Sequence, residues 1–327
     1  MHKRIFGKTN INVGEIGFGA WAIGGTWGAT DDSESTAALH AALNAGTDFI
    51  DTADVYGDGH SERLIAEVLK DRKGARPFIA TKAGRRLPAQ TVEGYSDANL
   101  RGWIDRSRKN LGMDTLDLVQ LHCPPSALYK SKAVFDILDR LKAEGKIANY
   151  GVSVEKISEA LDAIKHPGVV SVQIIFNIFR QRVAADFLSA ARSANVAVIA
   201  RVPLASGLLT GKMNGQSQFA KDDHRSFNRN GEFFDMGETF SGVPYHVGLE
   251  AVDRIRPLVT NNTMAAFALK WILMHDAVSV VIPGAKTVAQ AVSNASASDL
   301  LPLSSQTMGQ IKAVYDQMLR PHVQAKW

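Results

Sequence analysis

The sequence lacks several features that would place it in common classes of protein. Cys123 is the only cysteine among 327 residues, so no intrachain disulfide can form, and we expect a reducing compartment. No apolar run approaches the roughly 18 residues that a transmembrane helix needs. The first residues, Met1 to Arg4, do not open a signal peptide. We therefore expect a cytoplasmic protein that does not bind membranes.

A strong excess of one charge is also lacking. The 37 basic and 33 acidic residues give a net charge of +4, and they are interspersed, so nucleic acid is not an expected partner. Histidines such as His224, His246 and His275 show no metal-ligand spacing, and we expect no metal. There is no Pro- or Ser-rich linker, so we expect a single domain over residues 1–327 with the 45% hydrophobic content of a soluble globular protein.

The sequence does contain a regular alternation of short apolar runs and amphipathic segments. Residues 3–12 predict a β-hairpin with a turn at 7–10, and eight strand-then-helix units follow. The strands are expected at 15–18, 49–51, 78–82, 116–121, 147–153, 169–175, 196–202 and 278–282. The helices are expected at 37–45, 61–70, 97–111, 130–144, 155–165, 182–194, 262–275 and 287–296, with an extra helix at 304–319. This order predicts an α/β fold, a (β/α)8 TIM barrel with an N-terminal hairpin and an extra C-terminal helix.

One segment interrupts the alternation after the seventh strand. Residues 211–243 are polar and rich in glycine, which is long for a barrel loop. We expect this insertion to bury little apolar area, to be mobile without ligand, and to order over a cofactor or substrate.

Ionisable side chains stand at the ends of three successive predicted strands. Asp51 ends the second strand, Lys82 the third and His122 the fourth, and Tyr56 follows Asp51 by five residues. Catalytic groups collect at the carboxyl ends of strands in parallel α/β folds. An ammonium next to a phenol is expected to lower a pKa that is normally near 10. The pattern therefore predicts hydride transfer to a carbonyl with a proton relay through Tyr56.

A short glycine motif would indicate a Rossmann dinucleotide-binding fold, but the residues that follow it do not fit that fold. Gly17 to Ala22 matches the relaxed dinucleotide fingerprint G-x-G-x-x-G/A. The fingerprint needs a helix that starts on those glycines, and no helix can start here before about Ser33. We interpret the match as accidental.

Several of these motifs together resemble a known family. The stretches Phe49 to Gly57, Ala80 to Lys82 and Gln120 to His122 resemble the catalytic tetrad of the aldo-keto reductases, in their soluble general stress reductase and aldose dehydrogenase branch. Pro203 to Lys212 is similar to the loop of that family that clasps a pyrophosphate, and Ile282 to Thr287 to its adenosine-binding segment. The resemblance implies that Tyr56 donates a proton to a carbonyl oxygen and that His122 orients the carbonyl.

The resemblance also implies a cofactor site for NADPH, with NAD possible. Its residues would be Ala20, Trp21, Asp51, Ser153, Gln173, Phe176, Arg201, Pro203, Leu204, Ser206, Gly207, Leu209, Lys212, Gly284, Lys286, Thr287, Gln290 and Asn294. Phe176 would stack on the nicotinamide where relatives have tyrosine, and Val154 stands where many relatives have asparagine. The substrate, a small carbonyl compound, would contact Trp21, Tyr56 and His122. Trp21 and Trp27 could equally be core residues or an apolar substrate wall.

Two alternatives stay open at this point. One is an NAD(P)-dependent aldose or polyol dehydrogenase with the same fold and the opposite direction of reaction. The other is a cofactor-sensing binding subunit, similar to the potassium-channel β subunits of the family. We expect a monomer or a weak homo-oligomer.

Overall fold

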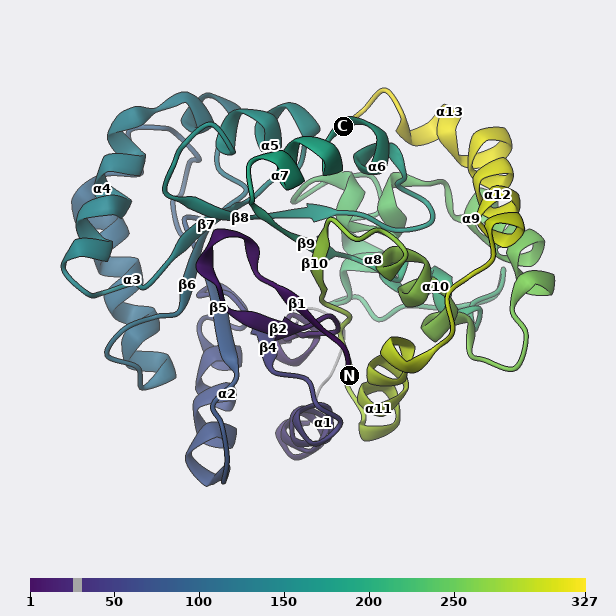
Figure 1. Cartoon of the computed structure of the whole chain (residues 1–327), viewed down its shortest axis with the longest axis horizontal. Helices are drawn as coiled ribbons and strands as arrows, with labels where there is room; N and C mark the ends of the chain where they lie inside the picture. The colour runs from purple at the N-terminus through teal and green to yellow at the C-terminus, as the bar shows by residue number, and fades with distance from the viewer. Residues whose placement is uncertain (26–30) are drawn as a thin grey trace.

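The computed structural model describes residues 1–25 and 31–327, which form alternating strands and helices around a curled parallel sheet (Figure 1). The sheet has eight strands in the order β10-β9-β8-β7-β6-β5-β4-β3, so each strand lies beside its predecessor in the chain. The strands are β3 Phe18–Gly19, β4 Phe49–Asp51, β5 Phe78–Ala83, β6 Leu118–His122, β7 Tyr150–Ser153, β8 Val169–Ile175, β9 Ala197–Arg201 and β10 Val278–Val281. The α/β fold with a parallel sheet is as predicted.

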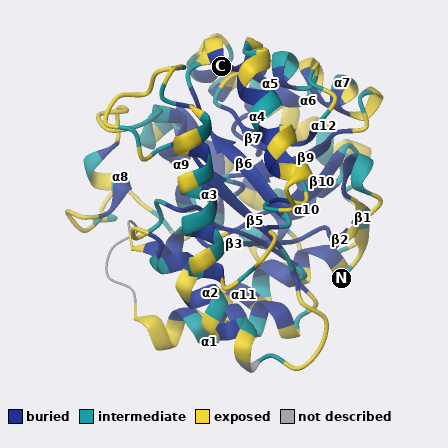
Figure 2. Cartoon of the chain, turned by 90° about the vertical axis from the view of Figure 1, so that its left-hand side faces the viewer, coloured by how far each residue is buried: buried dark blue, intermediate teal, exposed yellow. Residues whose placement is uncertain are grey.

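Helices surround this sheet and bury their inner faces against it (Figures 1 and 2). They are α1 Asp32–Asn44, α2 His60–Asp71, α3 Asp97–Leu111, α4 Lys132–Ala143, α5 Ile157–Ala163, α6 Arg182–Asp186, α7 Leu188–Ser193, α10 Met264–Leu273 and α11 Val288–Ala295. Local sequence sets their ends. Ser96 caps the amino terminus of α3 through its hydroxyl, and Gly112 ends the helix with a left-handed φ of 64°. Helix α3 and strand β8 match the predicted ranges residue for residue.

The sheet curls until its two edges meet. Gly17 N donates to Val281 O at 2.8 Å, and Val281 N donates to Glu15 O at 2.9 Å. Further along, Gly19 N donates to Pro283 O at 3.0 Å. The first and last strands are therefore joined by backbone hydrogen bonds.

The predicted hairpin is present and covers one end of the sheet. Strands β1 Lys3–Ile5 and β2 Asn12–Gly14 pair antiparallel, and Figure 1 shows them across the middle of the ring of strands. The Phe6 ring lies 5.5 Å from Phe49 and 5.4 Å from Phe78, centroid to centroid. Because Phe49 and Phe78 begin their strands, the hairpin closes the amino-terminal end. The carboxyl ends are left for the site.

The second half of the chain departs from the sequence prediction in three places. The helix expected at 182–194 is divided into α6 and α7, which meet at Phe187 with φ −132°. Helix α9, Tyr245–Ile255, was not predicted. The extra helix expected at 304–319 is helical over that span, as α12 Ser305–Val314 and a π-helical turn over Tyr315–Leu319, but it is not one regular helix and α13 Arg320–Val323 follows it.

The insertion is better packed than the sequence suggests. Its first part, 214–222, is mostly exposed, whereas 237–243 is buried throughout. A short helix, α8 His224–Phe227, lies between them. Phe240 and Val243 join the hydrophobic core. The expectation that the insertion buries little apolar area is therefore wrong for its second part. Among the described residues, none of the helices has the length and apolar content needed to cross a bilayer.

The closed end generates a stability prediction. Replacing Phe6 with Ala should lower the free energy of unfolding by about 3–5 kcal/mol, because it removes a fully buried ring from between Phe49 and Phe78. Denaturant unfolding followed by circular dichroism measures the change. The adjacent Ile5→Ala is the matched control: Ile5 is 62% exposed, and its loss should change stability by about 0.5 kcal/mol or less. Equal effects of the two substitutions would contradict this role of Phe6.

Candidate active site

The four predicted catalytic residues meet at the carboxyl ends of β4, β5 and β6. Lys82 Nζ is 2.5 Å from Asp51 Oδ1 and 3.1 Å from Tyr56 Oη. The rings of Tyr56 and His122 lie edge to face with centroids 5.9 Å apart. The phenol thus lies between an ammonium and an imidazole, as a proton donor to a bound carbonyl would need to.

Glutamine side chains beneath the tetrad fix the carboxylate. Asp51 Oδ2 accepts from Gln173 Nε2 at 2.7 Å and from Gln120 Nε2 at 3.1 Å. Lys82, only 1% exposed, also donates to Thr52 O at 2.9 Å. Burial alone lowers the pKa of Lys82, but the negative charge of Asp51 and the contact with Tyr56 raise it above its ordinary value. The lysine is therefore charged at neutral pH.

The pKa of Tyr56 differs from the sequence prediction. Burial raises it above 10, and the opposing effect of Lys82 does not compensate. Asp51 and Glu238 add to the increase through their negative charges. The expectation of a lowered pKa is wrong, because a buried phenolate loses more hydration than one ammonium restores. Tyr56 is thus a protonated phenol at neutral pH.

The imidazole of His122 is neutral and not a charged imidazolium. Burial lowers its pKa well below the ordinary value, and the positive charges of Arg85 and Lys82 act in the same direction. Its Nδ1 is buried and has no hydrogen-bond partner within the described residues. A neutral imidazole retains one N–H donor and one acceptor, so it can orient a carbonyl without competing for the proton.

A cavity of about 800 Å³ opens above the tetrad and extends to the start of α11. Predicted residues that line it are Trp21, Asp51, Tyr56, His122, Ser153, Gln173, Arg201, Pro203, Leu204, Ser206, Gly207, Lys212, Gly284, Lys286, Thr287, Gln290 and Asn294. The Trp21 ring stacks beside Tyr56 with centroids 6.1 Å apart, on the wall nearest the tetrad. Trp27 lies outside the described residues.

Three residues predicted to bind the cofactor, Ala20, Phe176 and Leu209, lie in the hydrophobic core and do not line the cavity. The Phe176 ring packs 5.2 Å from Trp271 and 4.9 Å from His275. Side chains alternate along a strand, and Phe176 is an odd number of positions beyond the inward-facing Gln173, so its ring takes the opposite face. The prediction that Phe176 stacks on the nicotinamide does not agree with this position.

The far end of the cavity is organised by side-chain caps. Thr287 caps α11, accepting from Gln290 N at 3.3 Å, and Gln290 Oε1 accepts from Lys286 N at 2.8 Å. Asn294 Nδ2 donates to Gly284 O at 3.1 Å. These contacts hold the loop before α11 in place, with Lys286 and the amino terminus of α11 beside the cavity.

Several lining residues were not predicted. Among those with polar or aromatic side chains are Arg85, Arg225, Phe234, Glu238, Thr263 and Ser293. Arg85 had a detectable signal, since it follows Lys82 on the same strand-end loop. Ser293 lies one helical turn beyond the predicted Gln290. Phe234 and Glu238 belong to the insertion, where the sequence has no periodicity that would place a side chain. No group of three or more His, Cys, Asp or Glu side chains in the described part of the chain is arranged to hold a metal ion.

Comparisons with known proteins agree with this geometry. A model of the aldo/keto reductase family matches residues 15–316. The aldo-keto reductase YhdN of Bacillus subtilis (strain 168) is 29% identical over 286 residues, which cover 86% of this chain and 84% of that protein. The aldo-keto reductase yakc of Schizosaccharomyces pombe, whose name specifies NADP(+), is 27% identical over 94% of this chain and 90% of its own length. The structure of the glycerol dehydrogenase AKR11B4 from Gluconobacter oxydans superimposes with a TM-score of 0.75 at 30% identity, covering 98% of this chain and 95% of the other.

The position of Phe176 is testable by substitution. Phe176→Leu should lower the melting temperature, because it removes ring contacts with Trp271 and His275, yet leave NADPH affinity within about twofold. Fluorescence titration of the cofactor beside thermal unfolding measures both. A tenfold loss of affinity in a protein that melts like the unmodified one would restore a stacking role.

Proposed function

Because the chain belongs to the aldo/keto reductase family, we propose that it uses NADPH to reduce aldehyde or ketone carbonyls to alcohols. The observation that carries this proposal is the contact of Tyr56 Oη with the buried, charged Lys82 Nζ at 3.1 Å, at the bottom of the cavity. Tyr56 donates its proton to the carbonyl oxygen as negative charge develops there. Neutral His122 donates a hydrogen bond that orients the same oxygen.

The cavity residues fit a long dinucleotide. At the tetrad end Ser153 and Gln173 offer hydroxyl and amide groups to a carboxamide, and at the far end Lys286 and Thr287 face the cavity. Between them Ser206 and Gly207 adopt left-handed φ values of 53° and 98°, and this loop would hold the pyrophosphate. The φ of 98° at Gly207 is one that residues with a Cβ rarely adopt, so the loop favours glycine here. The bound cofactor would supply the hydride, and the protein the geometry.

The reverse reaction is a second candidate, favoured by the 30% identity to a glycerol dehydrogenase. Oxidation of an alcohol requires Tyr56 to accept a proton, and hence a phenolate. Burial raises the pKa of Tyr56 above 10, which disfavours the phenolate at neutral pH.

The proposal also covers the closure of the barrel, the role of the insertion and the assembly of the protein. We infer that the curled sheet is a complete (β/α)8 barrel, supported by the hydrogen bonds between Gly17 and Val281 and between Gly19 and Pro283. Residues 211–243 would serve as a lid and 305–323 as an additional helical segment. A single domain that acts in the cytoplasm, as a monomer or weak homo-oligomer, remains a prediction.

The proton donor can be removed without changing the ring. Tyr56→Phe should lower kcat for an aldehyde about 10²- to 10⁴-fold while cofactor affinity stays near that of the unmodified protein. Steady-state rates and fluorescence titration of NADPH test this. Tyr150→Phe is a matched control, since Tyr150 is a buried tyrosine whose hydroxyl contacts Asp139 at 2.7 Å, outside the cavity lining. Activity of Tyr56→Phe within a few fold of the unmodified protein would mean that another group is the acid.

Cofactor choice depends on Lys286 in this proposal. An ammonium and the Thr287 hydroxyl at the amino terminus of α11 would meet the 2′-phosphate of NADPH. Lys286→Ala should weaken NADPH binding by about 10- to 150-fold, as expected for a charge-assisted hydrogen bond, and leave NADH nearly unchanged. Parallel titrations with both cofactors measure this, with Lys312→Ala on α12 as the control. Equal affinity of the unmodified protein for NADH and NADPH would overturn the assignment and favour an NAD-linked dehydrogenase.

A further inference from the structure

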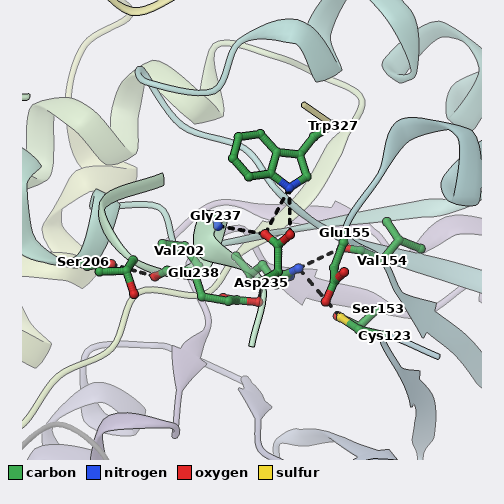
Figure 3. Close-up of polar contacts among 12 residues, drawn as sticks. Cys123, Ser153, Val154, Glu155, Val202, Ser206, Asp235, Gly237, Glu238 and Trp327 are labelled. Atoms are coloured by element: carbon green, nitrogen blue, oxygen red, sulfur yellow. Dashed lines mark hydrogen bonds and ion pairs between the residues drawn. The ribbon is translucent and has the colours of Figure 1, made fainter. Parts of the chain in front are cut away.

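The last residue of the sequence, Trp327, is packed against the insertion. Its indole Nε1 lies 3.0 Å from both carboxylate oxygens of Asp235 (Figure 3). The Arg180 guanidinium lies 3.9 Å from the indole ring centroid, and Arg182 Nη1 donates to Trp327 O at 2.5 Å. With only 7% of its surface exposed, Trp327 is held by a charge-assisted hydrogen bond, a cation–π contact and a backbone contact.

Two glycines of the insertion allow the indole to lie directly on the backbone. A Cβ added to Gly242 would come within 2.3 Å of the Trp327 ring, and one added to Gly237 within 3.2 Å. Asp235 also accepts from Gly237 N at 2.8 Å, so the carboxylate joins the indole to this turn (Figure 3). Trp327 therefore fixes the stretch 235–242 from one side.

The other side of the same stretch reaches the cavity. The Glu238 carboxylate pairs with the guanidinium of Arg201, the last residue of β9. Glu238 O accepts from Ser206 Oγ at 2.8 Å, and Ser206 Oγ accepts from Phe240 N at 3.0 Å. Glu238, Arg201 and Ser206 all line the cavity, whereas Trp327 and Asp235 do not. A continuous path of contacts thus joins Trp327 to the cofactor loop.

We propose that Trp327 is a positioning residue: it holds residues 235–242 against the cavity and so sets the rate at which the bound nicotinamide cofactor leaves. The proposal rests on the proposed function, because it requires a cofactor in this cavity. The insertion supplies one wall through Lys212, Met213, Arg225, Phe234 and Glu238. Outward movement of that wall breaks the hydrogen bonds of Trp327 with Asp235, while Arg180 and Arg182 outside the insertion keep the indole in place, so the Asp235 contact adds to the barrier to release.

The test measures cofactor dissociation directly. NADPH is bound to the full-length protein and chased with excess NADP⁺ in a stopped-flow fluorimeter. Trp327→Ala should raise the dissociation rate constant about tenfold, because it loses both the charge-assisted hydrogen bond to Asp235 and the ring contacts with the insertion. Trp327→Phe keeps an aromatic face on Gly237 and Gly242 but loses the N–H donor, and should give an intermediate rise of about threefold. Gly237→Ala should raise the rate as well, because its Cβ would come within 2.5 Å of Arg180 Nη1 and 2.6 Å of Asp235 Oδ1 and so displace the groups that hold the indole.

A control variant separates this role from a general loss of stability caused by removing a tryptophan. Trp103 on α3 is a half-buried tryptophan whose ring lies 5.8 Å from that of Tyr95, outside the cavity lining. Trp103→Ala should leave NADPH dissociation unchanged, with melting temperatures recorded for every variant. A comparable acceleration in Trp103→Ala would overturn the proposal.

The remaining outcomes also decide the question. If the unmodified protein binds NADPH and Trp327→Ala releases it within twofold of the unmodified rate, the positioning role is wrong and the proposed function stands. If Trp327→Ala does not fold, Trp327→Phe and Gly237→Ala carry the test, and unchanged rates in both overturn the role. If the unmodified protein does not bind NADPH, both the proposed function and this inference fall.

Discussion

The buried ion pair between Lys82 and Asp51 is the constraint on which the site depends. Two charges in a nearly dry interior are unfavourable unless each is fully hydrogen bonded. Here Asp51 accepts from Lys82, Gln173 and Gln120, and Lys82 also donates to Thr52 O and Tyr56. These partners come from β4, β5, β6 and β8, so the pair is satisfied only when the sheet curls correctly. The fold and the reactive phenol are thereby fixed by one set of contacts.

Burial, more than charge, sets the protonation of the two groups nearest the carbonyl site. It keeps the proton on Tyr56 and keeps His122 neutral, and in each case it is the largest influence on the pKa. In the proposed reaction, a protonated phenol and a neutral imidazole would place two hydrogen-bond donors at a carbonyl oxygen without adding a net charge to the cavity. This arrangement would stabilise an alkoxide-like transition state more than the neutral substrate.

The sequence was informative wherever a residue's position follows from its strand. Asp51, Lys82 and His122 were predicted because each stands at a strand end, and the end of α3 because Gly112 closes it. Phe176 was misplaced because a residue just beyond a strand keeps the alternation of that strand, which a motif alignment does not consider. The insertion and the tail ending in Trp327 were expected near the pocket, but the individual contacts of Glu238 and Trp327 could not be predicted, since they join segments that are distant in sequence and have no periodic pattern. The burial that raises the pKa of Tyr56 is likewise a property of the assembled cavity.

The hairpin at the amino-terminal end of the sheet has a consequence for the evolution of this protein. Phe6, Phe49 and Phe78 form a hydrophobic cluster at the end of the sheet opposite to the cavity. Substitutions that strengthen or weaken that cluster alter the tolerance of the molecule to mutation without reshaping the loops around Tyr56. Those loops can therefore diversify toward new substrates while the cluster preserves the fold.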